Sequence, residues 1–453
     1  VEQLALAADQ NELEVARTAQ ALAQAAWANL PAAPAPDDGE GQVDASAWPG
    51  LDLPPAAHVG YYLIGDGRTT LEERLGYRPT LRVSLARLAL RHPTVVYLGS
   101  IAGLTLLLLA AAAFYAVTQG GSLFFVLLAV ALVFLPALAA AVALVDWVIT
   151  LMASPRILPK LDLAGEPGVH GIPDTCRTLV VVPALLTSTQ EVASLVQQME
   201  LHYLRNPDHN LYFGLLTDFA DADEQDAPGD AALLEQVRAE IGLLNTRYAS
   251  ATGDQGGPFC LFHRERRWNA QEARWMGWER KRGKLNELNR WLRGATDTSI
   301  ISTIGQLEQL RLVKYVITLD ADTILGRDSA RRLIATLAHP LNRAEADPAT
   351  GRVVRGYGLL QPRTEITPTS ANYSRFSRIF AGDIGLDLYT HAVSNVYQDY
   401  FGSGIYIGKG IYDVDAFENS LAGRVPENTL LSHDLFEGIY ARVGLVTDIV
   451  VYE

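Results

Sequence analysis

The chain is poor in cysteine: it has two, Cys176 and Cys260, in no spacing that suits a metal site or a redox pair. We therefore expect no disulfide framework, and a reducing compartment for the globular part. Basic residues are outnumbered, because 37 Lys and Arg stand against 51 Asp and Glu, for a net charge of −14. That charge argues against general nucleic-acid binding. The N-terminus shows no charged, apolar, cleavable segment, so no export peptide is expected.

Two uncharged apolar runs, residues 95–117 and 122–145, are the most prominent feature of the sequence. Each can cross a hydrocarbon core about 30 Å thick, which favours two transmembrane helices over a buried helix pair in a soluble protein. The turn that joins them has no charge, whereas basic residues flank the pair on both sides: Arg82, Arg87, Arg91, Arg156 and Lys160. The positive-inside rule therefore places both flanks in the cytoplasm.

Four regions follow from this pattern. We expect an N-terminal helix with a linker rich in Pro, Ala and Asp over 1–57, a cytoplasmic pre-membrane segment over 58–94, the transmembrane pair over 95–152, and a globular domain over 174–453. The linker is expected at 31–39, where proline and aspartate gather. Because the last residues have the pattern of a strand, we expect the chain to be part of a larger protein, truncated at its C-terminal end.

Strands and helices alternate in the globular region. Strands are predicted at 178–183, 211–217, 259–263, 314–319 and 356–361, and helices at 188–203, 231–248, 283–293 and 329–338. The alternation predicts an α/β fold with a mostly parallel sheet and helices on both faces. The acidic stretch that ends at Asp230 is predicted to be a disordered loop.

Carboxylates stand at the ends of two of these strands. Asp218 ends one, and Asp320 and Asp322 follow the apolar run that begins at Lys314. In open α/β sheets, ligands bind beyond the carboxyl ends of the strands. In extended geometry Asp320 and Asp322 project on one side, where they could hold a hard cation that neutralises a diphosphate. The alternative is that they only cap the segment that follows.

Several motifs resemble those of the cellulose-synthase-like group, the processive membrane glycosyltransferases with a GT-A fold. They occur in the expected order: Val180-Val-Val-Pro183, Asp218, Lys281-Arg-Gly-Lys-Leu-Asn286, Leu319-Asp-Ala-Asp-Thr323, Gly402-Ser-Gly404 and Ser432-His-Asp434. Three longer stretches, 58–68, 275–289 and 400–413, resemble more narrowly the glycosyltransferase region of the cyclic β-1,2-glucan synthases. The Gln-x-x-Arg-Trp segment of the broader group has no match before Glu453.

The resemblance implies a GT-A domain and an inverting, metal-dependent transfer of glucose from UDP-glucose to a growing β-1,2-glucan. It implies Mg²⁺ or Mn²⁺ as cofactor, and a multi-pass protein of the bacterial inner membrane with its catalytic domain in the cytoplasm. The implied partners are UDP-glucose, the β-glucan acceptor, the lipid bilayer and the C-terminal domains of a larger chain. Nucleic acid is not among them.

The resemblance also implies roles for single residues. Asp434 resembles the catalytic base, with His433 where the broader group has Glu. Asp320 and Asp322 resemble the pair that handles the donor sugar and the metal, so that Asp320 is a catalytic candidate as well as a metal ligand. An inverting transfer needs one base for the proton of the attacking hydroxyl and a positive group for the departing diphosphate. The proposed residues supply both.

Further residues are expected to bind the substrates. Asp218 resembles the carboxylate that meets the uracil or ribose, and Lys281 and Asn286 resemble residues beside the nucleotide. Gln361 could line the donor site. The segment Gly402-Ser403-Gly404 fits a close approach of the backbone to an acceptor sugar, although glycine pairs of this kind are more often simple turns.

Other functions remain open at this stage. A related processive synthase could use another nucleotide sugar, and a catalytically inactive membrane protein could bind nucleotide or glycan as a scaffold. Basic and tryptophan residues alternate between Arg264 and Arg282, which fits a diphosphate-binding or interfacial loop better than an RNA-binding surface. The family builds glucan on a tyrosine, by resemblance, and Tyr248 is a weak candidate because we expect it in an accessible loop.

Overall fold

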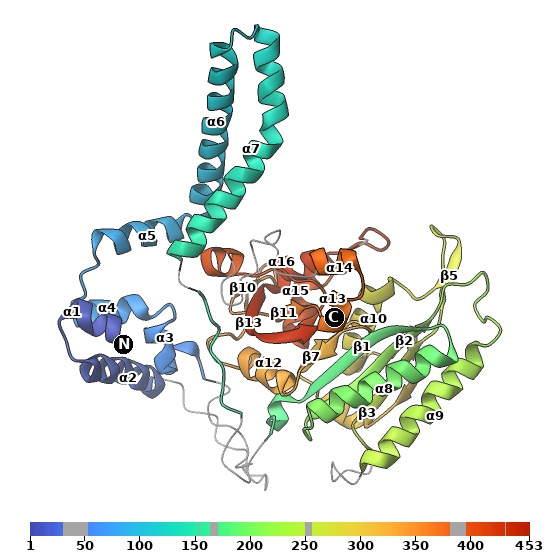
Figure 1. Ribbon diagram of the computed structural model, residues 1–453. Coiled ribbons are helices and arrows are strands. Elements are labelled where there is room, and N and C mark those ends of the chain that lie inside the picture. Colours follow the sequence, from blue (N-terminus) through green and yellow to red (C-terminus); the bar gives the residue numbers. More distant parts are fainter. Residues whose placement is uncertain (30–52, 154, 164–170, 250–255, 381–395, 431) are drawn as a thin grey trace. The chain divides into compact units, whose positions relative to one another are not determined.

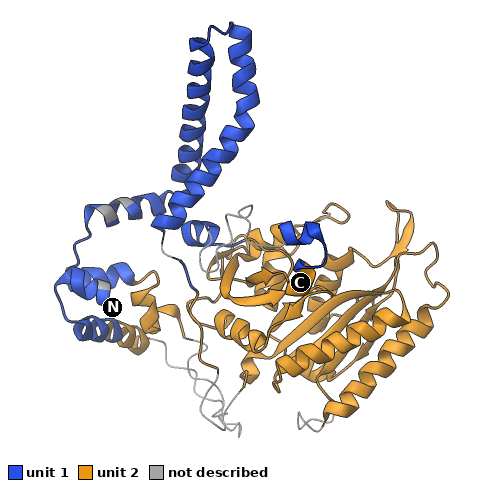
Figure 2. Cartoon of the chain, in the orientation of Figure 1, with its two compact units in different colours: residues 1–20, 68–157, 371–404 blue, residues 21–67, 158–370, 405–453 orange. Residues whose placement is uncertain are grey.

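The computed structural model describes residues 1–29, 53–153, 155–163, 171–249, 256–380, 396–430 and 432–453 (Figure 1). The linker predicted at 31–39 lies outside the described residues. The chain forms two compact units (Figure 2). The first comprises Val1–Gln20, Arg68–Ile157 and Ala371–Gly404, and the second comprises Ala21–Gly67, Leu158–Ser370 and Ile405–Glu453. The four regions expected from the sequence stay a prediction.

The first unit is helical. Its helices are α1 (Glu2–Ala8), the first part of α2 (Glu12–Ala28), α4 (Arg68–Leu75), α5 (Leu81–Arg91), α6 (Pro93–Thr118), α7 (Leu123–Met152), α14 (Arg375–Phe380) and a short π-helix, η4 (Tyr397–Phe401). Leu71 and Leu75 of α4 are buried, while Glu72 between them accepts hydrogen bonds from Arg68 and Arg87. The unit therefore has its own small core outside the long helices.

Helices α6 and α7 confirm the two predicted apolar helices. Both are long and apolar enough to cross a membrane, and only 11% and 6% of their most apolar windows are buried. A core helix of a soluble protein would bury most of that surface. The two helices pack side by side in Figure 1, and the Tyr97 hydroxyl donates to Asp146 Oδ1 at 2.9 Å. Asp146 is buried in this contact.

The second unit is built on a nine-stranded sheet in the order β6-β3-β2-β1-β7-β12-β11-β13-β8. The strands are β1 (Thr178–Leu186), β2 (Leu211–Phe219), β3 (Phe259–Arg264), β6 (Ile300–Ile304), β7 (Tyr315–Thr318), β8 (Ile324–Leu325), β11 (Leu359–Glu365), β12 (Gly410–Asp413) and β13 (Val443–Tyr452). Strands β1, β2, β3, β7, β11 and β13 run in one direction, and β6, β8 and β12 run in the other. Two hairpins lie outside the sheet: β4 (Arg267–Asn269) with β5 (Arg274–Met276), and β9 (Glu345–Ala346) with β10 (Val353–Arg355).

Helices cover both faces of the sheet, because successive residues of a strand point to opposite sides. Val180 and Val182 of β1 pack in a core with α8 and α9, which lie against one face in Figure 1. Leu179 and Val181 face a second core with α10, α15 and α16. The helices of the unit are α3 (Val59–Leu63), α8 (Thr189–Arg205), α9 (Asp230–Tyr248), α10 (Arg280–Leu292), α11 (Leu307–Arg311), α12 (Ser329–Leu337), α13 (Pro368–Ala371), α15 (Val414–Leu421) and α16 (Asp434–Ala441).

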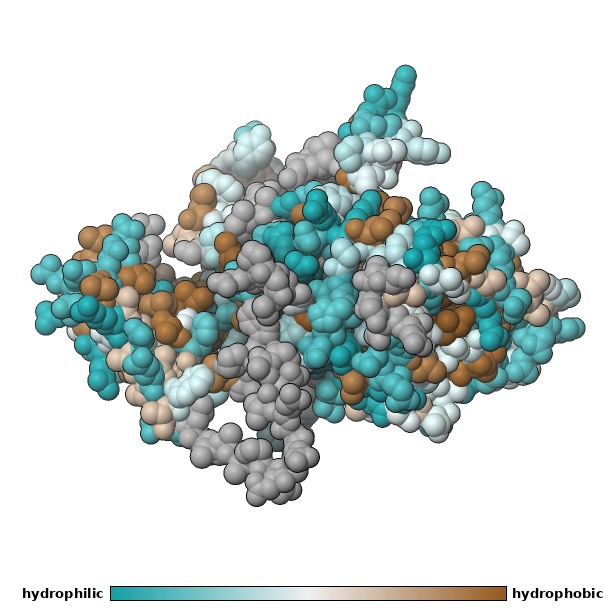
Figure 3. All heavy atoms as spheres, turned by 90° about the horizontal axis from the view of Figure 1, so that it is seen from below, coloured by the Kyte–Doolittle hydropathy of each residue, from teal (hydrophilic) through white to brown (hydrophobic). Residues whose placement is uncertain are grey.

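The predicted fold class is confirmed: the domain is α/β, with a mostly parallel sheet between helices and two long apolar helices elsewhere in the chain. All five predicted strands and all four predicted helices of the globular region are found, within a few residues of their expected ends. The face of the second unit turned to the viewer in Figure 3 is mostly hydrophilic, with scattered hydrophobic side chains. Such a surface fits a domain exposed to water.

The prediction of a disordered acidic loop before α9 is wrong. Arg266, which is 3% exposed, donates to the carbonyl oxygens of Ala220 and Gln225 and pairs with Asp230. Backbone hydrogen bonds join Ala222 to Trp275. A buried guanidinium thus fixes a loop whose composition alone favours disorder, because its carbonyl groups and carboxylate supply the partners that a buried cation requires.

Candidate active site

Polar side chains gather at one edge of the sheet. Strands β1, β2, β3 and β7 are parallel neighbours, so their carboxyl ends meet there. Asp218 lies near the end of β2, Arg264 ends β3, and Asp320 follows β7. The edge is thus the place where an α/β sheet receives its ligand.

Asp320 is held by two lysines. Lys281 of α10 donates to Asp320 Oδ1, and Lys409 Nζ lies 3.3 Å from Asp320 Oδ2. Lys409 reaches this position because β12 begins one residue later and runs antiparallel to β7, with Gly410 opposite Thr318. The sequence did not indicate Lys409, since only this strand pairing brings it beside a residue almost ninety positions earlier.

Three carboxylates could hold a cation at this edge. Atoms of Asp320, Asp322 and Glu453 lie within 4.8 Å of one another. Glu453 is brought in by the pairing of β13 with β8, in which Tyr452 lies opposite Ile324, and it also pairs with Lys409. Carboxylate oxygens are the ligands that Mg²⁺ and Mn²⁺ prefer, so the donor set fits the predicted metal. The lysines show that the same carboxylates also attract ammonium groups.

Asp434 is the first residue of α16, where the positive end of the helix dipole favours a carboxylate. Its side chain is 26% exposed, and its Oδ1 is buried without a hydrogen-bond partner among the described residues. It lies against Gly408, because a Cβ added to that glycine would come within 2.8 Å of Asp434 Oδ1. The carbonyl of Gly408 accepts a hydrogen bond of 3.1 Å from Lys281. Gly408 therefore contacts both the candidate base and a lysine that binds Asp320.

His433 and Glu437 form a pair beside the candidate base. His433 Nδ1 lies 2.7 Å from Glu437 Oε1 and 3.6 Å from Asp434 Oδ1. Burial raises the pKa of Glu437, and the hydrogen bond with His433 acts in the opposite direction. The three side chains have potential ligand atoms within 4.8 Å of one another, but their closest pair is already a hydrogen bond.

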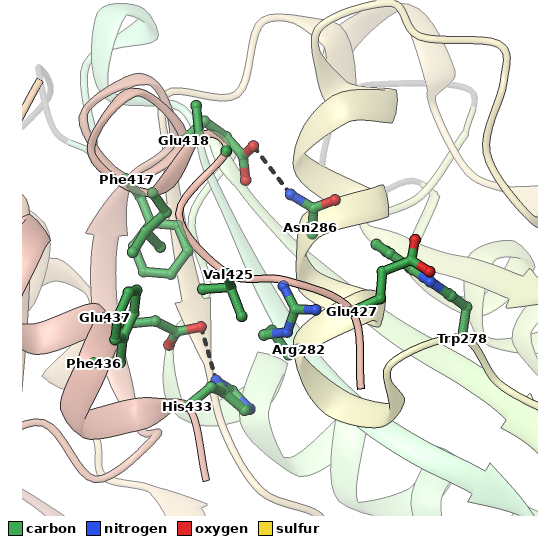
Figure 4. Close-up of a pocket in the computed structure, with 13 residues that line it drawn as sticks. Trp278, Arg282, Asn286, Phe417, Glu418, Val425, Glu427, His433, Phe436 and Glu437 are labelled. Atoms are coloured by element: carbon green, nitrogen blue, oxygen red, sulfur yellow. Dashed lines mark hydrogen bonds and ion pairs between the residues drawn. The ribbon is translucent and has the colours of Figure 1, made fainter. Parts of the chain in front are cut away.

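The pair lines a cavity of about 230 Å³ between α10, α15 and α16 (Figure 4). Other lining residues include aromatic, acidic and basic side chains: Trp278, Phe417, Phe436, Glu418, Glu427 and Arg282. Asn286, predicted to lie beside the nucleotide, lines this cavity and donates to Glu418 Oε2 at 3.3 Å. The burial of Glu418 raises its pKa, opposed by its hydrogen bond with Asn289. Lys281 and Asn286 thus lie on the same helix but have different neighbours.

Asp218 belongs to a buried ion-pair network. Its two oxygens each accept a 2.8 Å hydrogen bond from Arg264, and Lys284 Nζ lies 3.4 Å from Oδ2. Arg264 also donates to Glu287 at 2.9 Å. Asp218 is 2% exposed. Burial lowers the pKa of Lys284, while the carboxylate of Asp218 raises it. The predicted contact of Asp218 with a uracil or ribose stays a prediction, but the network gives this residue a structural function.

Gln361 is also engaged by the protein itself. It is 3% exposed, accepts a 3.0 Å hydrogen bond from Ile407 N and donates to Pro362 O. Its predicted place in the donor site is not excluded by these contacts, but they show that its amide fixes the segment that leads to Gly408. It therefore helps to position the residue that contacts Asp434.

The segment Gly402-Ser403-Gly404 belongs to the first unit, whereas the other predicted site residues belong to the second. Gly402 ends the π-helix η4 with φ of 72°, a left-handed conformation that glycine adopts without strain. The turn interpretation thus accounts for this glycine. A role of the segment at an acceptor sugar stays a prediction.

The stretch Arg264 to Arg282 is less available for a ligand than its composition indicated. Arg264 and Arg266 are buried in ion pairs. Residues 267–276 form the β4–β5 hairpin, in which the rings of Trp268 and Trp275 meet edge to face. An RNA-binding surface would lack two of its expected cations.

Tyr248 is less accessible than the sequence indicated. It ends α9, its hydroxyl donates to Glu200 at 2.7 Å, and its ring packs against Tyr203 and Phe259. Residues 250–255 of the expected loop lie outside the described residues.

Sequence reasoning missed four residues of the site: Lys409, Glu437, Glu453 and Lys284. Glu437 had a signal, because it follows His433 by four positions and so shares its face of a helix. Lys284 also had a signal, because it stands in the motif Lys281-Arg-Gly-Lys-Leu-Asn286. Lys409 and Glu453 had none, since tertiary contacts alone bring them in.

The chain was compared with known proteins. No protein-family model matches it. It is 44% identical over 405 residues to a cyclic beta-(1,2)-glucan synthase, NdvB, of Rhizobium meliloti (strain 1021), which confirms the resemblance predicted from the motifs. The match covers 87% of this chain and 14% of that protein. The chain is also similar to a crystal structure of S. aureus TarS, residues 1–349. The match covers 61% of this chain and 60% of the TarS chain, at 10% identity and a TM-score of 0.30. That score is too low to support an argument.

Proposed function

From the 44% identity with a segment of a cyclic β-(1,2)-glucan synthase, we propose that this chain is the glycosyltransferase part of such an enzyme. It transfers glucose from UDP-glucose, with inversion and with a divalent cation, to a growing β-1,2-glucan. The chain spans 14% of the length of that relative, and the proposal concerns the transfer step alone.

One observation carries the proposal: the segment Gly408-Lys409 contacts both halves of the required chemistry. Lys409 lies 3.3 Å from Asp320, and Gly408 lies against Asp434. The strand-end carboxylate Asp320 and the carboxylate Asp434 at the N-terminus of α16 therefore both lie next to this segment. An inverting transfer needs this arrangement, with a positive site for the diphosphate and a base for the acceptor hydroxyl.

The residues divide the chemistry as follows. Asp434 accepts the proton of the attacking hydroxyl as the bond between the anomeric carbon and the diphosphate breaks in a single in-line displacement. Asp320, Asp322 and Glu453 would hold Mg²⁺ or Mn²⁺, which supplies positive charge to the departing diphosphate. When the donor binds, Lys281 and Lys409 release Asp320 and contact the phosphate oxygens instead. They thereby add positive charge beside the departing diphosphate.

Binding of UDP tests the donor site. We expect UDP to bind the purified protein in detergent with Mn²⁺ or Mg²⁺, to bind weakly with a chelator, and to lose its cation-dependent binding in Asp322→Ala, measured by calorimetry. Asp223→Ala is the matched control, because Asp223 is an exposed carboxylate of the acidic loop, and it should bind as wild type does. If UDP binds under no cation, the strand-end carboxylates are structural and a scaffold function becomes the better interpretation.

The donor sugar requires a separate test, because an in-class alternative is a synthase that uses another nucleotide sugar. Competition among nucleotide sugars for the Mn²⁺-dependent site should show the tightest binding for UDP-glucose. Tighter binding of an epimer would contradict the glucose assignment while leaving the reaction type intact.

We further propose that α6 and α7 cross the bacterial inner membrane, with the catalytic domain in the cytoplasm. The basic flanks and the uncharged turn support this orientation. Cysteines introduced at Arg91 and at Gly120 should be labelled from opposite sides of inverted and right-side-out vesicles. Labelling of both from the same side would exclude the orientation.

Gly408 gives a prediction about the position of the base. Gly408 has φ of 84°, and a Cβ there would press on the Asp434 carboxylate. We expect Gly408→Ala to lower kcat on the order of tenfold or more, because an ångström of displacement at a reacting group costs that much or more. Gly423→Ala is the control, because Gly423 also has positive φ, 70°, but nothing within 4 Å of its added Cβ.

Both alanine variants should lose a similar amount of stability, about 1 kcal/mol, from the left-handed backbone. Transfer assays and thermal unfolding then separate the two effects. Equal losses of kcat in the two variants would mean that Gly408 acts through backbone strain and not through Asp434.

A further inference from the structure

We propose that His433 and Glu437 form a positioning pair that orients the catalytic base Asp434. The proposal rests on the function proposed above. It concerns two residues that do not contact the donor carboxylates in this structure.

The geometry of the first turn of α16 carries the proposal. His433 is the residue that precedes the helix, and Glu437 lies one turn later on the same face. The backbone N–H of Glu437 donates to His433 O at 2.9 Å, and the side chains meet at 2.7 Å. His433 and Glu437 are thus joined twice, through their backbones and through their side chains, across the turn that contains Asp434. An imidazole held this way cannot turn away from the Asp434 carboxylate, which lies 3.6 Å from the same ring nitrogen.

Burial makes the pair more than a surface helix contact. The side chains of Glu437 and His433 are 5% and 11% exposed. Glu437 Oε2 and Asp434 Oδ1 are buried, and neither has a hydrogen-bond partner among the described residues. A buried carboxylate oxygen without a partner is costly. His433 Nδ1 lies beside both carboxyl groups, at Glu437 Oε1 and at Asp434 Oδ1, and so links the two side chains.

Other ionisable groups also act on the pair. Lys281 of α10 favours the charged form of Glu437, and Asp434 disfavours it. Glu437 in turn faces groups on neighbouring elements: Tyr406, Tyr412 of β12 and Glu418 of α15. Burial raises the pKa of all four of these groups, Glu437 included. Arg282 of α10 lines the same cavity and brings a positive charge to it. The pair therefore lies among both acidic and basic groups.

The pair gives a reason for the histidine at this position. In the resembling group a Glu precedes the base, which would add a third carboxylate to Asp434 and Glu437 here. A histidine replaces that charge with a hydrogen-bond donor. His433 binds Glu437 and only approaches the base, whose side chain is 26% exposed and so accessible to the acceptor hydroxyl.

The test measures kcat and KM for transfer by the purified protein. Glu437→Gln keeps a side chain of the same size but replaces the carboxylate that meets His433 Nδ1 by an amide, whose hydrogen bond is weaker. We expect kcat to fall on the order of tenfold, with the KM for UDP-glucose nearly unchanged, since positioning residues act on the chemical step.

Three further variants distinguish positioning from structure. Glu427→Gln is the matched control, because Glu427 lines the same cavity and is exposed, and it should leave kcat and KM unchanged. The double variant His433→Gln with Glu437→Gln should be no slower than either single variant, since residues that act as one unit are not additive. Glu437→Asp, whose shorter side chain keeps the carboxylate, should recover part of the lost kcat.

Three results would overturn the proposal. The first is a wild-type kcat in Glu437→Gln. The second is additive losses in the double variant with no recovery in Glu437→Asp, which would make the pair a structural clamp. The third is a loss of one bound Mn²⁺ in Glu437→Gln, measured by electron paramagnetic resonance, which would make the cluster a cation site. A wild-type protein without transfer would instead refute the proposed function, so the two failures are distinguishable.

Discussion

Asp434→Asn is expected to lower kcat by about 10²- to 10⁴-fold, the usual contribution of a general base. Asparagine has the same shape and can occupy the same first turn of α16, but it cannot accept the proton of the attacking hydroxyl. Binding of UDP-glucose should change little, because Asp434 contacts Gly408 and is not one of the carboxylates proposed to hold the metal and the diphosphate. Transfer assays combined with calorimetric donor binding check both halves of this expectation.

Asp415→Asn is a suitable control for that variant. Asp415 lies in the first turn of the neighbouring helix α15, another helix of eight residues, and it pairs with Arg293 on the surface. Its replacement should change kcat by less than about twofold, since exposed ion pairs contribute little. A wild-type kcat in Asp434→Asn would place the base elsewhere, and the strand-end carboxylates would then be the first residues to examine.

Arg264→Met is expected to be the most destabilising of the changes considered, by about 3–5 kcal/mol in the free energy of unfolding of the second unit. Arg264 has no exposed surface and neutralises both Asp218 and Glu287. Without it, two carboxylates stay buried, with Lys284 3.4 Å from Asp218 and the half-exposed Arg267 4.0 Å from Glu287 as nearby cations. Denaturant unfolding of the purified protein, followed by tryptophan fluorescence, measures the loss.

Arg274→Met is the matched control for Arg264→Met. Arg274 belongs to the same basic stretch, but it is exposed and stands in the β4–β5 hairpin, outside the buried network. Its replacement should cost less than about 1 kcal/mol. Similar losses in the two variants would mean that the buried network contributes no more than a surface pair, and that Asp218 is free for a ligand.

Local sequence patterns were sufficient for most of the fold. Apolar β-branched runs predicted the strands, and helical spacing predicted the helices between them, because each of these elements must bury one face or both. The apolar runs predicted α6 and α7 for the same reason, since their length and lack of charge need no tertiary information. The acidic loop before α9 was mispredicted because its order depends on Arg266, which lies 36 residues from Asp230.

The candidate site was predictable only in part. Asp320, Asp322 and Asp434 stand in recognisable motifs, and a strand end is visible in a sequence. Lys409 and Glu453 are not, because antiparallel pairings of β12 with β7 and of β13 with β8 bring them to Asp320. No local pattern specifies which strands become neighbours in a sheet.

The sequence by itself determined the α/β class, the two apolar helices and the motifs that indicate a glycosyltransferase, because periodicity, length and residue type are local properties. The tertiary structure decided which charges are buried and which meet. It placed Asp218 in a network with Arg264, and it paired Glu437 with His433 beside Asp434. The physical reason is that burial and ion pairing depend on distances between side chains, and those distances are fixed only when helices and strands pack.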